Sequence, residues 1–260
     1  MSAIPVSTTP RFGDQAALYD QYRPYYPTAL FDHILGKVTG RRLAVDLGSG
    51  TGRTLRPLTT IFDTVIAIEP DADMAAHIAP SPGLRVQTNT AETATLPAGI
   101  DLVCCGTSFH WMDGDAVLSR LAPLMAPGGA LAILTYYRPD PGPAAKGVVE
   151  QEFAERWNAH KNDGQHRHSA PQRTVGDHPD WQTPERVMIP ATYELSADAY
   201  AGFFATTSYG AAYLKTLDDP ADYLCDLAGR LAAAAGADPM PVSLPVELVL
   251  SRPVRAGASA

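Results

Sequence analysis

The stretch AVDLGSGTGR at residues 44–53 constrains the fold more than any other part of the sequence. An apolar run ends in Asp46 and breaks into three alternating glycines, Gly48, Gly50 and Gly52. Glycines directly after a strand let the backbone pass close to a ligand, and a helix that opens behind them directs unpaired N–H groups toward negative charge. The stretch therefore predicts a strand, a ligand-binding loop and a helix in succession.

The spacing of these glycines argues against a dinucleotide. Dinucleotide-binding loops follow G-x-G-x-x-G, whereas this loop reads G-x-G-x-G and has the carboxylate of Asp46 two residues before Gly48. A pyrophosphate would meet that carboxylate, so the loop favours a ligand with a positive charge nearby, or with amine and hydroxyl donors. Glu69 ends the next apolar run, where a carboxylate can bind two vicinal ribose hydroxyls. We therefore expect a ligand that contains a ribose.

Apolar runs alternate with helical patterns through the first half of the chain. The expected strands are residues 43–47, 64–70, 84–88, 100–106 and 130–137. Strands that are apolar on both faces and alternate with helices form a parallel sheet covered on both sides. Near the end of the chain, SLPVELVLS has a period of two, which is typical of a late antiparallel strand at or near a sheet edge. We predict an α/β fold with a doubly wound, mostly parallel seven-stranded sheet.

The remaining segments are expected to cover the ligand within one domain, residues 1–260. Two helices, at residues 13–22 and 28–38, precede the first strand, and residues 1–40 are expected to form an N-terminal lid. The core spans 41–137, an inserted cap spans 138–185, and C-terminal strands and helices fill 186–260. In the cap we expect one helix, KGVVEQEFAERWNAH, and after it one strand, RVMIPATYEL.

Composition limits the partners and the compartment. The formal net charge of −8 gives no broad basic footprint for nucleic acid. The N-terminus has no signal-like pattern, and no apolar stretch approaches the length that a membrane span needs. Of the three cysteines, Cys104 and Cys105 lie side by side in an apolar run, where packing explains them. We expect a cytoplasmic protein without nucleic-acid or membrane partners.

A histidine-rich stretch in the expected cap invites a metal hypothesis. Its histidines are His160, His166, His168 and His178. Their spacing matches no closed metal site and their neighbours are mostly polar, so we favour a solvated cap segment and expect no metal. The alternative of an anionic substrate attracted by Arg167, Arg173 and these histidines stays open.

Four motifs together resemble the class I S-adenosylmethionine-dependent methyltransferases over roughly residues 13–137. They are VDLGSGTGR, AIEPDADM, IDLVCCGTSFHWMD and LAPLMAPGGALAILTYY, in the order and spacing of that class. The segments YDQYRPYYP and FHW are similar to its small-molecule branch, which includes trans-aconitate-type methyltransferases. The resemblance implies a Rossmann-like methyltransferase fold, S-adenosyl-L-methionine as cofactor and a small-molecule acceptor. An acidic loop suits a cofactor with an amino-acid moiety and a sulfonium cation.

The resemblance also implies which residues bind the cofactor. Asp46, Gly48 and Gly50 would line its methionine half, and Glu69 would hold its ribose. An N-terminal helix folded over the cofactor would bring Tyr19 and Arg23 near the methionine carboxylate, which an arginine can bind bidentately. The further cofactor-binding candidates are Ser49, Pro70, Thr90, Ala91, Glu92 and Thr107. Thr90 stands where the family commonly has an aspartate.

His110 is the candidate catalytic residue, because it follows the fourth strand at the edge where open α/β sheets bind ligands. It would take a proton from the acceptor. We favour the alternative that His110 orders the pocket wall beside Trp111, hydrogen-bonded to a backbone carbonyl. Two other functions stay open: an enzyme that binds the same cofactor but cyclises or isomerises its substrate, and a non-catalytic binding module.

Overall fold

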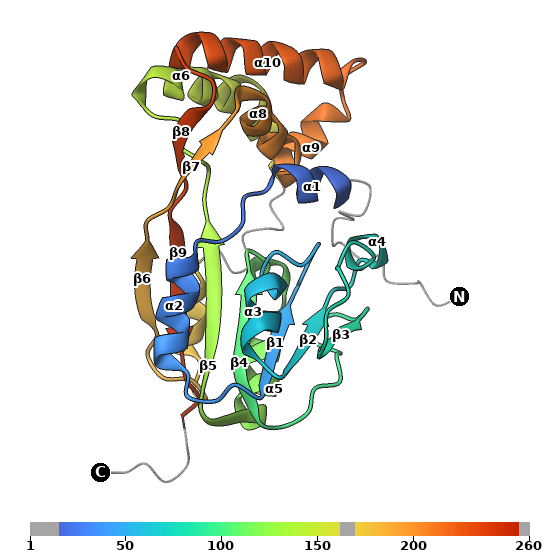
Figure 1. Cartoon of the computed structure of the whole chain (residues 1–260), viewed down its shortest axis with the longest axis vertical. Helices are drawn as coiled ribbons and strands as arrows, with labels where there is room; N and C mark the ends of the chain where they lie inside the picture. Colours follow the sequence, from blue (N-terminus) through green and yellow to red (C-terminus); the bar gives the residue numbers. More distant parts are fainter. Residues whose placement is uncertain (1–15, 162–169, 255–260) are drawn as a thin grey trace.

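A seven-stranded sheet forms the centre of the chain, in the order β3-β2-β1-β4-β5-β9-β6 (Figure 1). The computed structural model describes residues 16–161 and 170–254. The strands are β1 (Leu43–Leu47), β2 (Thr64–Ile68), β3 (Leu84–Gln87), β4 (Ile100–Gly106), β5 (Met125–Tyr136), β6 (Glu185–Ile189) and β9 (Val246–Ser251). Strands β1 to β5 pair in parallel, and β9 runs antiparallel to β5 and β6. The predicted doubly wound α/β class and the late antiparallel strand are confirmed.

Helices cover both faces of the sheet because its central strands are apolar on both sides. Helices α2 (Thr28–Lys37) and α3 (Leu55–Ile61) pack on one face, in a core that includes Ile34, Leu58 and Leu102. Helices α5 (Gly114–Leu121) and α7 (Pro171–Asp177) pack on the other, in a core that includes Val103 and Val175. Shorter elements at the ends of strands are α4 (Ala72–Ala75), η2 (Phe109–Trp111) and η3 (Ala122–Leu124).

An outer layer stands beyond the carboxyl ends of the parallel strands (Figure 1). It consists of α6 (Pro143–Glu152), η4 (Phe153–Trp157), η5 (Asn158–His160), α8 (Ala197–Ala205), α9 (Ser208–Leu214), α10 (Pro220–Ala235) and the antiparallel pair β7 (Thr192–Leu195) and β8 (Met240–Ser243). The layer has an apolar core of its own, in which Trp157 stacks on Phe204 with ring centroids 4.3 Å apart. It is therefore a packed layer rather than a loose loop.

A buried carboxylate joins the helices of the outer layer. Glu152 is fully buried at the end of α6 and accepts hydrogen bonds from the hydroxyl of Tyr223 at 2.6 Å and from Arg156 at 2.7 Å. Arg230 of α10 donates to the same carboxylate. A buried charge is tolerated when opposite charges and hydrogen bonds satisfy it. Glu152 thus links α6 and η4 to α10.

The structure divides two predicted segments differently from the sequence analysis. The single strand expected at RVMIPATYEL is broken at Pro190, and β6 joins the large sheet while β7 pairs with β8 in the outer layer. Proline lacks the N–H that a continuous ladder needs. Within the expected cap, Trp181 packs against the sheet and donates its indole N–H to the carbonyl of Leu118 at 3.0 Å. The outer layer is therefore not the expected cap alone. It is built from residues 143–160, which precede β6, and from residues 192–243, which follow it.

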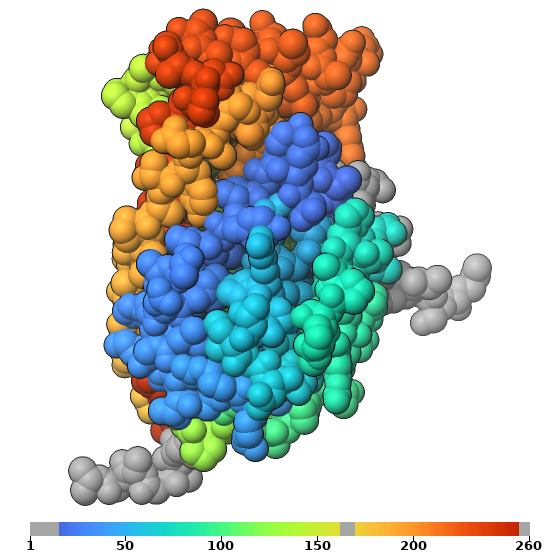
Figure 2. Space-filling view, viewed as in Figure 1, coloured from blue at the N-terminus to red at the C-terminus, as the bar shows by residue number. Residues whose placement is uncertain are grey.

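Helix α1 (Ala16–Tyr22) lies between the outer layer and the sheet (Figure 1). Its Tyr22 ring packs against Gly202 of α8, where a Cβ atom would lie 2.5 Å from the ring. Figure 2 shows the segment that contains α1 and α2 crossing this face of the molecule from the core to the outer layer. The earlier part of the expected lid, residues 1–15, lies outside the described residues. Of the helices described, none is long and apolar enough to cross a membrane.

Candidate functional site

A cavity of about 1290 Å³ lies between the carboxyl edge of the sheet, helix α1 and the outer layer. Its wall comes from the segments that follow β1, β2, β3, β4 and β5, together with residues of α1, α8 and α9. This is the edge at which open α/β sheets bind ligands. Pockets for one small ligand usually measure about 300–1,000 Å³, so this cavity has room for two ligands side by side.

The glycine loop after β1 is folded back onto β2. The N–H groups of Gly48 and Ser49 both donate to the carbonyl of Ile68, at 2.8 and 3.0 Å. Gly48 and Gly50 line the cavity with positive φ angles of 68° and 55°, a region that favours glycine. A Cβ on Gly48 would lie 2.5 Å from that of Ser108. The loop therefore brings bare backbone to the cavity, as a ligand cradle requires.

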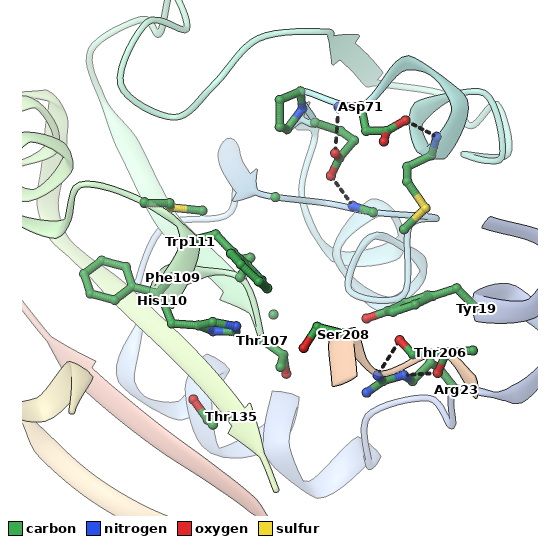
Figure 3. Close-up of a pocket in the computed structure, with 18 of the residues that line it drawn as sticks. Tyr19, Arg23, Asp71, Thr107, Phe109, His110, Trp111, Thr135, Thr206 and Ser208 are labelled. Atoms are coloured by element: carbon green, nitrogen blue, oxygen red, sulfur yellow. Dashed lines mark hydrogen bonds between the residues drawn. The ribbon is translucent and has the colours of Figure 1, made fainter. Parts of the chain in front are cut away.

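Glu69 fixes this loop from the end of β2. Its Oε2 accepts the N–H of Gly50 at 2.7 Å and its Oε1 accepts the N–H of Asp71 at 2.9 Å (Figure 3). The side chain is nearly buried at the cavity wall, and this burial raises the pKa of the carboxyl. A carboxylate has about four acceptor positions, so Glu69 can accept ligand hydroxyls while it keeps both backbone bonds.

Asp46 lies beneath the loop rather than in the cavity wall, which differs from the expectation that it lines the ligand. It is fully buried, and its Oδ2 accepts the hydroxyl of Thr54 at 2.5 Å. Its Oδ1 is buried without a hydrogen-bond partner in the part of the chain that the structure describes. Burial raises the pKa of Asp46 to about 6. Ser49 is also outside the wall, with its hydroxyl donating to the carbonyl of Asp46 at 3.1 Å.

The other candidates from the sheet edge line the cavity, namely Pro70, Thr90, Ala91, Glu92 and Thr107. Glu92 accepts the N–H of Asp113 at 2.8 Å, which ties the segment after β3 to the segment after β4. Thr107 has a φ of 54°, unusual for a residue other than glycine, and its hydroxyl lies 2.9 Å from that of Tyr26. Such backbone strain concentrates at functional sites.

Arg23 and Tyr19 reach the cavity from the N-terminal segment. The guanidinium of Arg23 donates to the hydroxyl of Thr206 at 2.7 Å, to the carbonyl of the same residue at 3.0 Å and to the hydroxyl of Tyr136 at 3.1 Å. It also lies over aromatic rings, 4.3 Å from the Phe203 centroid and 5.0 Å from that of Tyr19. In Figure 3, Tyr19 and Arg23 stand on one side of the cavity, opposite His110 and Trp111.

The hydrogen-bond partners of Arg23 among the described residues are all neutral. No carboxylate of residues 16–161 or 170–254 lies within ion-pair distance of its guanidinium. A cation held at a cavity wall by neutral groups is satisfied electrostatically when an anion binds there. The site therefore offers Arg23 to a carboxylate of a ligand, and Tyr19 beside it.

His110 lies in the cavity wall with its ring centroid 4.9 Å from that of Trp111. Burial lowers the pKa of its imidazole to about 4, so the ring is neutral at pH 7. The backbone hydrogen bond expected for a wall residue is not formed, because the ring bonds to none of the described residues. A neutral imidazole can accept a proton, but one with this pKa is a weak base.

Sequence analysis missed much of the wall on the side of β5 and the outer layer. The missed residues are Ile133, Thr135, Tyr137, Arg138, Pro171, Phe203, Thr206, Thr207, Ser208 and Tyr209. The TYYR segment ends β5 at the same carboxyl edge, so its position was a usable signal. The residues of α8 and α9 carry no local signal, because packing of the outer layer brings them to the cavity.

Among residues 16–161 and 170–254, no group of three His, Cys, Asp or Glu side chains could hold a metal ion. His178 is buried beside α5, and its Nε2 lies 3.0 Å from the hydroxyl of Ser119 in that helix. His166 and His168 lie outside the described residues, as does Arg167.

Comparison with known proteins agrees with this geometry. A methyltransferase domain family matches residues 45–133, from β1 to β5. A protein of Dictyostelium discoideum named as a methyltransferase is 25% identical, over 82% of this chain and 83% of its own length. A solved structure from Anaeromyxobacter dehalogenans, described as a type II methyltransferase, is 25% identical with a TM-score of 0.73, covering 89% of this chain and 98% of that one.

A relative from Saccharomyces cerevisiae is named as an S-adenosylmethionine-dependent methyltransferase and is 24% identical, over 48% of this chain and 47% of its own length. The chain also spans about half the length of matching mycobacterial proteins. Together these findings identify the fold as the Rossmann-like methyltransferase fold and the protein as a methyltransferase enzyme with S-adenosylmethionine as its cofactor.

The burial of Asp46 predicts an unusual dependence of stability on pH. Between pH 4 and pH 6 the folded protein holds a proton on Asp46 that the unfolded chain has released, because the folded pKa of about 6 exceeds the usual 3.8. Stability therefore falls as the pH rises through this window, by about 3 kcal/mol for this group. Urea unfolding of the protein without cofactor measures it. In Asp46→Asn this contribution is absent, and parallel stability curves for the two proteins would contradict the assignment.

Proposed function

We propose that this methyltransferase transfers the methyl group of S-adenosylmethionine to a small-molecule acceptor bound in the same cavity. The observation that carries the proposal is the size and position of the cavity, which exceeds the usual volume for one ligand and lies under α1 and the outer layer. A site covered in this way suits a small acceptor better than a folded protein or a nucleic-acid duplex. The net charge of −8 also opposes a polyanionic partner.

The cofactor half of the site is assigned to the ends of β1, β2 and β3. Glu69 would accept the ribose hydroxyls, the glycine loop would lie along the methionine half, and Arg23 would bind the methionine carboxylate. The segment 90–92 would border the adenine. Two features support this fit: the bare backbone of the loop and the neutral groups that the structure places around Arg23.

S-adenosylmethionine supplies a methyl group on a positively charged sulfur, where an in-line displacement by an acceptor atom is already activated. The chain is then required to align the acceptor and to exclude water. Phe203, Tyr136 and Trp111 provide apolar wall area for this purpose. The low pKa of His110 favours its role in the wall over that of a general base, and suits an acceptor that ionises without help.

The charges of the cavity wall support an acidic acceptor. All the carboxylates of the wall that the structure describes belong to residues 69–92, namely Glu69, Asp71, Asp73 and Glu92. The far side, after β5, carries Arg138, whose guanidinium lies over the Phe153 ring at 4.5 Å. A carboxylate is attracted to that side and repelled from the other. This agrees with the resemblance to the trans-aconitate-type branch, whose acceptors are carboxylic acids.

The first test is ligand binding by titration calorimetry. S-adenosylmethionine and S-adenosylhomocysteine should bind, whereas dinucleotides should not, because the loop spacing and the Glu69 carboxylate in the cavity wall disfavour pyrophosphate. Glu69→Ala should weaken S-adenosylhomocysteine binding by about 1–3 kcal/mol, the usual cost of losing charged hydrogen bonds. Glu150→Ala, on the exposed face of α6, is the matched control and should bind as the wild type does. Equal affinities in all three proteins would remove Glu69 from the ribose site.

A second test concerns His110. As a wall residue, His110→Gln should raise the Michaelis constant for the acceptor with little change in turnover. As a general base, it should instead lower turnover about 10²- to 10⁴-fold while cofactor affinity stays close to that of the wild type. Steady-state kinetics and cofactor titration on the same preparation separate the two roles, and a variant with unchanged turnover and affinities would exclude both.

A third test addresses the acceptor. With carboxylic acids from a panel of small molecules as acceptors, the enzyme should release S-adenosylhomocysteine. The corresponding neutral amides should react at least about tenfold more slowly, because loss of a charged hydrogen bond lowers binding by about that factor or more. Arg138→Met should remove the preference, whereas Arg85→Met, at an exposed position of β3 outside the cavity wall, should keep it. Preference for neutral acceptors would contradict the acidic class. Product without S-adenosylhomocysteine would indicate a non-methylating reaction, and binding without turnover a non-catalytic module.

A further inference from the structure

We infer that Arg53 is a positioning residue, which holds helix α1 against the glycine loop so that Tyr19 and Arg23 reach the cofactor half of the cavity. The inference rests on the proposed function in one respect, the assignment of Arg23 to the cofactor. Arg53 is not part of the cavity wall, so any effect on the cofactor must pass through other residues.

The contacts of Arg53 join two segments that are far apart in the sequence. Its guanidinium donates to the carbonyl of Tyr19 at 3.3 Å and to the carbonyl of Asp20, and it lies 3.4 Å from the Asp20 carboxylate. On its other side the guanidinium lies over the Tyr25 ring, 4.3 Å from the centroid. Arg53 thus grips α1 and the turn that follows it from a position directly after Gly52.

These two carbonyls lie at the carboxyl end of α1. Both belong to its last turn, where carbonyl groups carry partial negative charge and can accept a hydrogen bond from a donor outside the helix. The Tyr19 carbonyl also accepts the backbone N–H of Arg23 at 3.1 Å. One peptide group therefore connects Arg53 to the backbone of Arg23, and movement of this peptide displaces both Tyr19, in α1, and Arg23, directly after α1.

The burial of Arg53 makes this contact costly to open. The residue is 8% exposed, while the Asp20 side chain beside it is 54% exposed. A buried guanidinium that loses its acceptors bears the desolvation penalty of an unsatisfied charge. By contrast, Arg56 lies over the same Tyr25 ring at 5.5 Å, but it is exposed and bonds to no carbonyl of α1 among the described residues. Of these two arginines, Arg53 is therefore the one that joins the glycine loop to α1.

The glycine loop and α1 are consequently coupled through Arg53. A ligand that orders the loop also favours the docked position of α1, and docked α1 favours ligand binding by the same factor, because coupling of this kind is reciprocal. A docked α1 brings Arg23 to the cavity before the cofactor arrives, which reduces the cost of ordering it on binding.

The experiment compares Arg53→Met, which keeps the stem but removes the donors, with Arg53→Lys and with the control Arg56→Met. In the full chain without ligand, amide hydrogen exchange in residues 16–22 should be about tenfold faster in Arg53→Met than in the wild type, and partly restored in Arg53→Lys. S-adenosylhomocysteine should bind about tenfold more weakly to Arg53→Met. Arg56→Met should match the wild type in both measurements. Unchanged exchange in Arg53→Met would overturn the inference.

A double-mutant cycle with Arg23→Met separates positioning from support of the loop. If Arg53 acts through Arg23, its effect on the ligand should disappear once the Arg23 guanidinium has been removed. Adding Arg53→Met to Arg23→Met should then lower S-adenosylhomocysteine affinity by less than about twofold. Additive losses would overturn the inference and indicate that Arg53 supports the loop alone. If the wild type itself fails to bind S-adenosylhomocysteine, the proposed function fails, while the exchange measurement still decides whether Arg53 holds α1.

Discussion

Two carboxylates withdrawn from water at the ends of β1 and β2 are the constraint on which the site depends. Asp46 lies fully buried under the glycine loop, and Glu69 uses two of its acceptor positions for the backbone N–H groups of Gly50 and Asp71. Burial raises the pKa of both groups, so the folded chain bears a cost for keeping them there. A protein that lowers its folding stability in this way commonly does so at a site that binds a ligand.

The cover over this edge is assembled from three separate parts of the chain. Helix α1 comes from the N-terminal part, α6 and η4 follow β5, and α8 to α10 follow β6. Buried polar contacts join these parts, with Glu152 between α6 and α10 and Arg53 between the glycine loop and α1. The apolar cores alone would leave the relative positions of these helices less sharply defined, because hydrophobic burial is not directional.

The distribution of charge in the cavity divides it into two chemically different halves. Carboxylates border the side formed by β2 and β3, and Arg138 borders the side formed by β5 and the outer layer. Arg23 stands between α1 and α8 with neutral partners, where a carboxylate of the cofactor would satisfy it. One cavity can therefore discriminate a zwitterionic, ribose-containing ligand from an acidic one by position alone.

The sequence by itself determined which segments of the chain form the parallel strands, where the glycine loop lies and where Glu69 stands. Each of these features depends on local periodicity or on backbone freedom within a few residues. Only the tertiary structure decided that Asp46 is buried outside the cavity wall, that His110 is buried enough to stay neutral, and that α8 and α9 supply part of the wall. It also split the segment at Pro190 between two sheets. These features follow from packing between distant segments, which the pattern of any one segment does not specify.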